Sequence, residues 1–198
     1  MKDQMHSPHL LKLVDYHDSI LRQTMEPVQF PLSKEDKKLI KDMKFSIQKK
    51  QLKKANACWE SAAGMAANQW GIRKRIFLFC PFGSEDNAQV VINPSYEPLP
   101  NLSLLQPMEE EDLESCFSVP LAVGNIRRYI RIRATSQNDQ GEFITQELTG
   151  RIARVWQHET DHLNGLLYDD PTTGRCLYKK EFASKEMVED FYRNPKGF

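Results

Sequence analysis

The sequence predicts an α+β fold with a mainly antiparallel or mixed sheet. Runs rich in β-forming residues gather before the last long helical stretch, and strands and helices do not alternate in the regular way that a parallel sheet requires. The chain has 198 residues, a length typical of one domain with a sizeable core. We therefore expect a single domain over residues 1–198.

The first predicted helix begins after Ser33, which suits the N-cap position and is followed by acidic residues. Leu39, Ile40, Met43 and Ile47 then recur at helical spacing and form an apolar stripe. The many lysines of this region are most simply the water-facing side of an amphipathic helix, and a basic docking surface is the alternative.

Later segments read as strands separated by turns and loops. The predicted strands are residues 75–79, 89–92, 129–134 and 143–148. Residues 138–141 give a turn signal between the last two. The acidic run at 109–112 is expected to be a loop, and residues near 186–193 a short C-terminal helix stopped by Pro195.

Composition narrows the class of protein. Lys plus Arg and Asp plus Glu both number 27, which argues against a nucleic-acid-binding face over the whole molecule but not against a local basic patch. We expect no recognition of a specific nucleic-acid sequence. No apolar run approaches a membrane span, and residues 1–6 lack the apolar centre of a signal peptide. The cysteines form no C-x-x-C pair and suggest a reducing compartment. They are Cys58, Cys80, Cys116 and Cys176.

The most informative motif is His158-Glu159-Thr160-Asp161-His162. It lies in a predicted helix that begins near Thr149 or Gly150 and ends at Asn164-Gly165. Residues four apart share one helical face, so two imidazoles so placed can bind one Zn²⁺ or Fe²⁺ ion. Glu159 flanks that face and is placed to take a proton from a water that the metal activates.

A third metal ligand has several candidates in the sequence. The extended zinc-protease pattern fails, because Tyr168 holds the position of its third His. Glu181 and Glu186 would supply the downstream Glu of another metallopeptidase class. Cys116 stands out among the cysteines because it follows the acidic run and precedes a β-like run. A Cys/His/His set leaves a fourth position for water, which is a catalytic geometry.

Three segments together resemble peptide deformylases. They correspond to that family's G-x-G-x-A-A-x-Q, E-G-C-L-S and Q-H-E-x-D-H motifs and occur in the same order. The matching segments are residues 62–69, 114–118 and 157–162. Weaker similarity includes Ser19-Ile20-Leu21-Arg22 and a strand end at Ile92-Asn93-Pro94, and the resemblance extends from about residue 15 to about residue 170.

The resemblance implies an enzyme that removes the formyl group from the N-terminal formyl-methionine of nascent polypeptides, with antiparallel or mixed sheets around a central motif helix. Cys116, His158 and His162 would hold one divalent ion, with Fe²⁺ as the native ion and Zn²⁺, Ni²⁺ or Co²⁺ as alternatives. The thiolate leaves that set with net +1 charge, which favours Fe²⁺ or Zn²⁺. The family also implies a location in a bacterial-type cytoplasm, with an organelle as the alternative. The expected partners are formyl-methionyl nascent chains, either at the ribosome or released from it, and no membrane is expected.

Residue roles follow from the same resemblance. Glu159 would be the general base and then the general acid. The amide of Gln69 and the backbone N–H of Phe117 would stabilise the oxyanion. The substrate-binding positions would be Ala63, Gly64, Ser115 and Val155. Glu114 and Asp161 would be partners that orient charged groups near the site, or simply surface acids.

The chain departs from the family pattern at three cleft positions. Ala62 and Ser115 replace glycines, and Phe117 replaces a leucine. The family's Arg after the Cys motif has no certain counterpart within residues 123–128. Alongside an ordinary deformylase, the sequence allows an enzyme with altered peptide preference, a metallopeptidase using a downstream Glu, and a protein that binds formylated peptides without turning them over.

Overall fold

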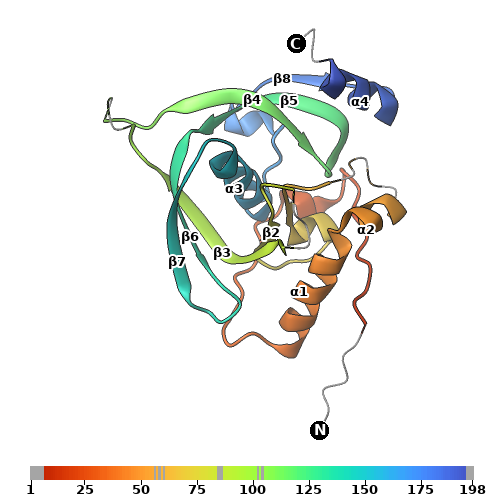
Figure 1. The fold of residues 1–198 in the computed structure, drawn as a ribbon, viewed down its shortest axis with the longest axis vertical. Helices are drawn as coiled ribbons and strands as arrows, with labels where there is room; N and C mark the ends of the chain where they lie inside the picture. The colour runs from red at the N-terminus through yellow and green to blue at the C-terminus, as the bar shows by residue number, and fades with distance from the viewer. Residues whose placement is uncertain are drawn as a thin grey trace.

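Two antiparallel sheets surround one helix, α3 (Gly150–Leu163), in this computed structural model (Figure 1). The structure describes residues 7–55, 57, 59, 61–83, 87–101, 103 and 105–194. The first sheet has the order β1-β2-β3-β6-β7, with strands Gly64–Ala66, Ile76–Phe79, Gln89–Pro98, Arg131–Gln137 and Phe143–Thr149. The second has the order β4-β5-β8, with strands Glu109–Cys116, Val119–Tyr129 and Cys176–Glu181. The α+β prediction with antiparallel sheets is confirmed.

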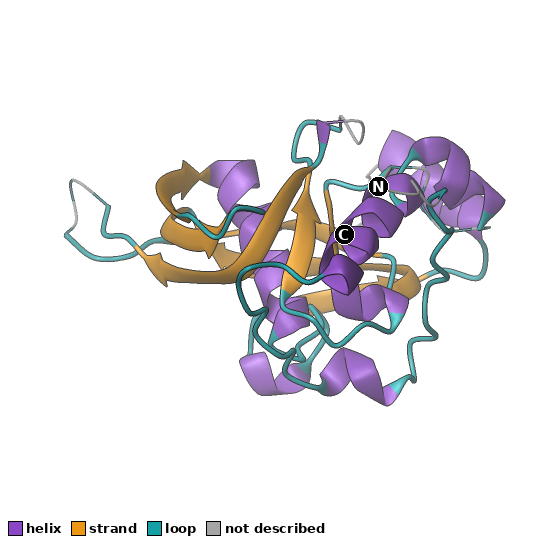
Figure 2. Cartoon of the chain, turned by 90° about the horizontal axis from the view of Figure 1, so that it is seen from below, coloured by secondary structure: helices purple, strands orange, loops and turns teal. Residues whose placement is uncertain are grey.

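Helix α3 is held between the sheets by its apolar face. It contacts strands of both sheets, and Figure 2 shows the curved strands with helices packed against them. The Trp156 ring meets Phe77 and Phe79 edge-on, with centroids 5.2 and 5.4 Å away, a favoured geometry for aromatic pairs. This packing fixes the rotation of α3 and therefore the direction in which its histidines point.

Both ends of α3 follow local sequence signals. Thr149 is its N-cap residue, in extended conformation, as the sequence predicts. Gly165 follows the helix with φ +76°, which glycine adopts without strain. A Cβ at Gly165 would lie 2.7 Å from the backbone carbon of Arg22. Only glycine therefore lets the 3-10 turn η1 (Ser19–Arg22) pack this closely against the helix end.

The other helices within the described residues are α1 (Lys34–Ser46), α2 (Lys49–Lys54) and α4 (Lys185–Arg193). Two further 3-10 turns are η2 (Ala67–Trp70), which is buried, and η4 (Pro171–Thr173). Ser33 caps α1 by accepting a hydrogen bond from Asp36 N, as predicted. The stripe residues Ile40, Met43 and Ile47 are buried, whereas Leu39 is only half-buried. The lysines of α1 and α2 are all exposed.

Each sheet presents one edge strand toward the same region. β1 is the outer strand of the five-stranded sheet, and β4 is the outer strand of the three-stranded sheet. A strand at a sheet edge keeps a row of backbone N–H and C=O groups free to pair with another strand. The site described below lies where these two edges and α3 meet.

Three predicted details of the strands were wrong. The acidic run at 109–112 is not a loop but the start of β4, paired with β5; Arg127 on β5 lies 3.9 Å from Glu109 and 3.4 Å from Glu111 and offsets their charge. The stretch 129–134 is divided, because β5 ends at Tyr129 and β6 begins at Arg131. Asn93 does not end a strand, since β3 continues through a register shift between Ile92 and Ser95.

Some sequence-based predictions fall on residues that the structure does not describe. These are Cys58, Pro195 and the N-terminal residues 1–6. Cys80 and Cys116 are buried, and Cys176 is half-buried. Among the described residues, no helix has both the length and the apolar character needed to span a membrane.

Candidate active site

Three potential metal ligands converge at the meeting point of β4 and α3. The Sγ of Cys116, at the end of β4, and one ring nitrogen each of His158 and His162, on α3, all lie within 4.8 Å of one another. Cys116 Sγ is 3.1 Å from His162 Nε2. One thiolate and two imidazoles form a set that Zn²⁺ and Fe²⁺ accept, and three protein ligands leave a position open. The donor set therefore fits a single catalytic ion.

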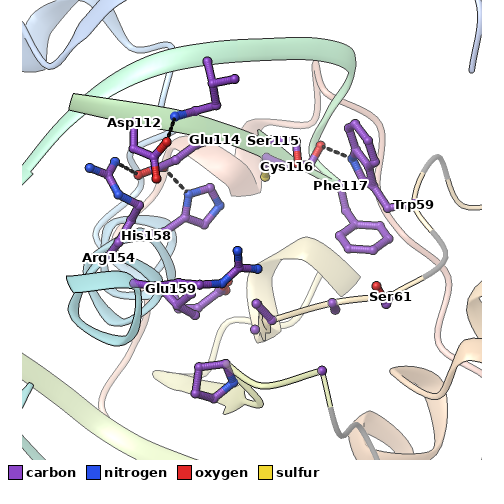
Figure 3. Close-up of a pocket in the computed structure, with 18 of the residues that line it drawn as sticks. Trp59, Ser61, Asp112, Glu114, Ser115, Cys116, Phe117, Arg154, His158 and Glu159 are labelled. Carbon is purple, nitrogen blue, oxygen red and sulfur yellow. Dashed lines mark hydrogen bonds and ion pairs between the residues drawn. The ribbon is translucent and has the colours of Figure 1, made fainter. Parts of the chain in front are cut away.

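The two histidines have different surroundings. His158 Nδ1 is 2.8 Å from Glu114 Oε2 (Figure 3), which fixes the ring and leaves Nε2 for the metal. Burial lowers the pKa of His162 well below its usual value, and the nearby His158 acts in the same direction. A neutral imidazole has the free nitrogen lone pair that metal binding requires.

Glu114 connects the site to a buried group of arginines. Arg128 donates to its carboxylate through Nε at 2.9 Å and a terminal nitrogen at 3.0 Å, and Arg154 donates at 2.9 Å. Burial alone would raise the pKa of Glu114, but Arg128 and the His158 ring outweigh it and hold the pKa well below its usual range. Glu114 is therefore an anion that orients His158, which confirms one of its two sequence interpretations.

Asp161, also on α3, takes part in the same network through Arg128. It is buried and accepts hydrogen bonds from Arg128 and, at 2.8 Å, from Arg175. The interpretation of Asp161 as a surface acid is therefore wrong. Arg128, which is 2% exposed, is the buried arginine of residues 123–128, the stretch in which the sequence left the family's arginine unplaced. Arg154 and Arg175 were missed entirely, because their partners lie on other elements.

Glu159 lies beside the ligand group and is 4% exposed. Its Oε2 has no hydrogen-bond partner among the described residues. Burial raises the pKa of Glu159 to about 7, although the nearby His158 lowers it. A buried carboxyl group with a raised pKa next to a metal-binding set is a typical arrangement for proton transfer.

Gln69 and Phe117 bring hydrogen-bond donors to the same place. Gln69 Oε1 accepts from Ala66 N at 2.8 Å, which turns the amide so that Nε2 lies 3.1 Å from Ser118 Oγ and 3.6 Å from Cys116 Sγ. The backbone N–H of Phe117, in the turn between β4 and β5, donates to no acceptor among the described residues. The Gln69 amide is thus oriented toward the ligand group, and the Phe117 N–H is left without an acceptor among the described residues beside it.

A pocket of about 650 Å³ opens over these residues. Ala63, Gly64, Ser115 and Val155, the positions predicted to bind substrate, all line it, as do Gln69, Phe117 and Glu159. The three departures from the family pattern line it too, through Ala62, Ser115 and Phe117. Trp59 and Tyr192 also contribute to the wall and were not predicted from the sequence.

The carboxylates proposed as alternative third ligands lie elsewhere. Glu181, on β8, has an exposed side chain that pairs with Lys179 at 2.8 Å. Glu186 is exposed in the first turn of α4. Neither belongs to the described group of potential ligands, in which Cys116 occupies the third place.

The fold and the site define a candidate mononuclear metal hydrolase, with H-E-x-x-H on a central helix and a thiolate from a neighbouring strand. Comparison with known proteins identifies the family. The model of the polypeptide deformylase family matches residues 10–176. The chain is 35% identical over 182 residues to the peptide deformylase of Thermotoga maritima, covering 91% of this chain and 96% of the relative. It is 33% identical over 158 residues to that of Shouchella clausii, covering 78% and 85%.

Solved structures agree with the sequence relatives. The crystal structure of the Thermotoga maritima peptide deformylase superposes with a TM-score of 0.65 at 30% identity, covering 86% of this chain and 99% of that one. A Met-Ala-Ser-bound class I type b peptide deformylase from Acinetobacter baumannii gives 0.66 at 26% identity, with coverages of 82% and 98%. The chain belongs to the polypeptide deformylase family, metal-dependent enzymes that remove the formyl group from N-terminal formyl-methionine.

Proposed function

We propose that Cys116, His158 and His162 hold one divalent ion and that Glu159 performs the proton transfers of deformylation. The observation that carries this assignment is the convergence of the three ligand atoms within 4.8 Å. The buried carboxyl group of Glu159 follows directly after one ligand and lines the same pocket. A divalent ion in this set supplies Lewis acidity toward water and toward the formyl carbonyl.

Glu159 has the position of a proton carrier between water and the leaving amine. Its Oε2 has no hydrogen-bond partner among the described residues, so it is free to accept the proton of the attacking water. The same oxygen then returns the proton to the peptide nitrogen as the C–N bond breaks. Formate and a free amino terminus are the products.

Gln69 and Phe117 are suited to stabilise the negative charge that develops on the formyl oxygen. The Gln69 amide is held by Ala66 N and Ser118 Oγ, so it requires little reorganisation during the reaction. A preorganised donor of this kind typically contributes about 3 kcal/mol to transition-state stabilisation. Ser118 and Ala66 act as positioning residues for that amide.

The substrate peptide binds as an extended chain between β1 and β4 in this proposal. Both are edge strands, and both contribute to the pocket through residues such as Gly64 and Ser115. An extended peptide can therefore use free backbone groups on either side, which is recognition by strand addition. Ala63 and Val155 then contact the side chain of the first residue.

The proposal also names the native metal ion, the substrates and the compartment. Fe²⁺ is the proposed native ion, and Zn²⁺, Ni²⁺ or Co²⁺ can take its place in the same donors. The partners are formyl-methionyl nascent peptides, met at the ribosome in a bacterial-type cytoplasm. No specific nucleic-acid sequence and no membrane enter the proposal.

The test is metal analysis of anaerobically purified protein together with turnover of formyl-Met-Ala-Ser. We expect one metal ion per chain and release of formate that stops when a chelator removes the ion. A preparation that retains one ion per chain but releases no formate would refute the proposed activity. The same sample should be reloaded separately with Fe²⁺, Zn²⁺, Ni²⁺ and Co²⁺ to identify the most active form.

A further inference from the structure

Trp59 forms part of the pocket wall and contacts the main chain of a proposed metal ligand. Its indole N–H donates a hydrogen bond to the backbone oxygen of Cys116 at 3.3 Å (Figure 3). The indole is half-buried and lines the pocket. The side chain of Cys116 is thus directed to the ligand group, while its carbonyl is held by a residue that has no part in the mechanism proposed above.

The carbonyl that Trp59 holds belongs to the same peptide group as the N–H of Phe117. A trans peptide group is planar, so its C=O and N–H point in opposite directions and turn as one unit. A donor on the carbonyl side therefore limits the rotation of the N–H on the other side. The hydrogen bond also polarises the group, which makes the N–H a stronger donor. The Phe117 N–H has no acceptor among the described residues, so it is available to a ligand in the pocket.

This peptide group lies where the pairing of β4 with β5 is irregular. The register shifts between Ser115 and Cys116, and Cys116 then pairs with Val119 across the turn. A regular ladder orients its peptide groups through successive hydrogen bonds, and a shift of register interrupts that series. A side-chain donor from outside the sheet therefore has more influence on the Cys116 carbonyl than it would have in the middle of a strand.

The C-terminal helix α4 holds the indole of Trp59 in place. The ring of Tyr192 meets it edge-on, with centroids 5.7 Å apart and planes at 86°, a favoured geometry for aromatic pairs. Trp59 also packs against an apolar cluster that contains Val188 and Phe191 of the same helix. The direction of the indole N–H is therefore fixed by packing before a substrate binds.

We propose that Trp59 is a positioning residue for deformylation, which holds the Cys116 carbonyl so that the N–H of Phe117 faces the formyl oxygen. The inference rests on the proposed function, because it is there that this N–H is assigned to stabilise the oxyanion. Trp59 acts through the peptide group and touches neither the metal nor the reacting atoms. Its contribution should appear in kcat, since the charge on the formyl oxygen develops only in the transition state.

The first experiment is Trp59→Phe, which keeps an aromatic ring but removes the N–H. We expect kcat for formyl-Met-Ala-Ser to fall about three- to tenfold, less than the loss of a whole oxyanion donor, because the Phe117 N–H is still present. KM should stay within about twofold, as should the Kd of the deformylated product Met-Ala-Ser, which has no formyl oxygen. The metal content per chain should not change.

The second experiment observes the peptide group without turnover. Cys116 and Phe117 form the only Cys-Phe step in the sequence, so ¹³C-carbonyl cysteine together with ¹⁵N-phenylalanine gives a single NMR correlation from this bond. Zinc-loaded protein suits the measurement, because Zn²⁺ has a filled d shell. In Trp59→Phe the carbonyl carbon of Cys116 should move to lower chemical shift, since the lost hydrogen bond no longer polarises it.

Phe182→Leu is the matched control. Phe182 packs against the same apolar cluster as Trp59 and lies outside the pocket lining, so this variant weakens the packing without removing an N–H donor. It should leave kcat and the carbonyl resonance unchanged.

Three results would overturn the inference: a carbonyl resonance that does not move in Trp59→Phe, an equal loss of kcat in the two variants, or an effect of Trp59→Phe on KM alone. An unaltered enzyme that releases no formate would refute the proposed function. In that case the resonance would still decide whether Trp59 holds the peptide group.

Discussion

Gly64 on β1 lies directly against the side chain of Glu159 on α3. A Cβ added to Gly64 would be 2.6 Å from Glu159 Cγ and 2.7 Å from its Oε1, closer than real side-chain contacts allow. The sequence placed Gly64 among the residues expected to bind the substrate. The structure shows that the missing side chain makes room for the side chain of Glu159.

Replacing Gly64 by Ala should therefore displace Glu159 while leaving the metal ligands in place. A shift of about 1 Å in a catalytic group typically costs about a hundredfold in rate, and we expect a loss of that order in kcat. The measurement is formate release at saturating peptide with metal content determined in parallel. In the double variant with Glu159→Gln, the second change should add almost nothing, because both act through one carboxylate.

Cys116→Ala should remove stoichiometric metal binding or weaken it strongly. Two imidazoles on one helical face retain only part of the donor set, and the anionic ligand is lost. Metal content per chain after dialysis is the measurement. Full occupancy and activity in this variant would contradict the proposed ligand set. Cys176→Ala is the control, since Cys176 lies outside the ligand group.

Glu159→Gln should keep the fold and the metal but lose nearly all turnover. Glutamine has almost the same shape and cannot accept the proton, and general acid–base catalysis contributes about 10²–10⁴-fold. Single-turnover rates with formyl-Met-Ala-Ser give the loss directly. Activity within a few fold of the unaltered enzyme would show that another group is the base.

Glu114→Gln should lower stability as well as activity. The carboxylate compensates Arg128 and Arg154, both buried, and removing one member of a buried ion pair typically costs about 3–5 kcal/mol. Urea unfolding of the metal-free protein isolates this effect from metal binding. Glu97→Gln, which breaks an exposed pair with Arg133, should change the free energy of unfolding by less than about 1 kcal/mol.

The departures at Ala62, Ser115 and Phe117 should narrow the range of accepted peptides. All three line the pocket and carry more atoms than the family's Gly, Gly and Leu. Reverting them together should broaden the peptide range and change KM more than kcat. Kinetic profiles over a formyl peptide library give the answer. If the profiles before and after reversion coincide, these substitutions have no part in specificity.

The sequence predicts those parts of the site that depend on local spacing. His158 and His162 share a face because the helix repeats every 3.6 residues. Ser115 and Phe117 could be assigned to the site because they are adjacent to Cys116 in the sequence. Arg128 and Arg154 could not be assigned in this way. Their partner Glu114 is 14 and 40 residues away in the chain, and only the pairing of β4 with β5 and the packing of α3 bring them together.

The same limit explains the errors in the fold. Four successive acids disfavour a strand when read alone. Residues 109–112 nevertheless begin β4, because Arg127 on the neighbouring strand and the packing of the later residues of β4 outweigh that local preference. Helices α1 and α3 were predicted closely, because the capping residues and the apolar periodicity that indicate a helix lie within each segment itself. Residues 129–134 were predicted as one strand because the sequence has no glycine or proline there. The chain in fact passes from one sheet to the other at Ile130, between β5 and β6.

An edge strand that receives a peptide is equally open to the edge of another molecule. Residues 109–112 place four acidic side chains along the first half of β4, and Arg127 and Arg154 offset this charge only in part. Two copies meeting edge to edge would set these acids against each other, and like charges facing across a strand pair are repulsive. The charge falls away toward Ser115 and Cys116, where the pocket opens. We therefore expect the acidic stretch to disfavour edge-to-edge pairing of two copies along the first half of β4.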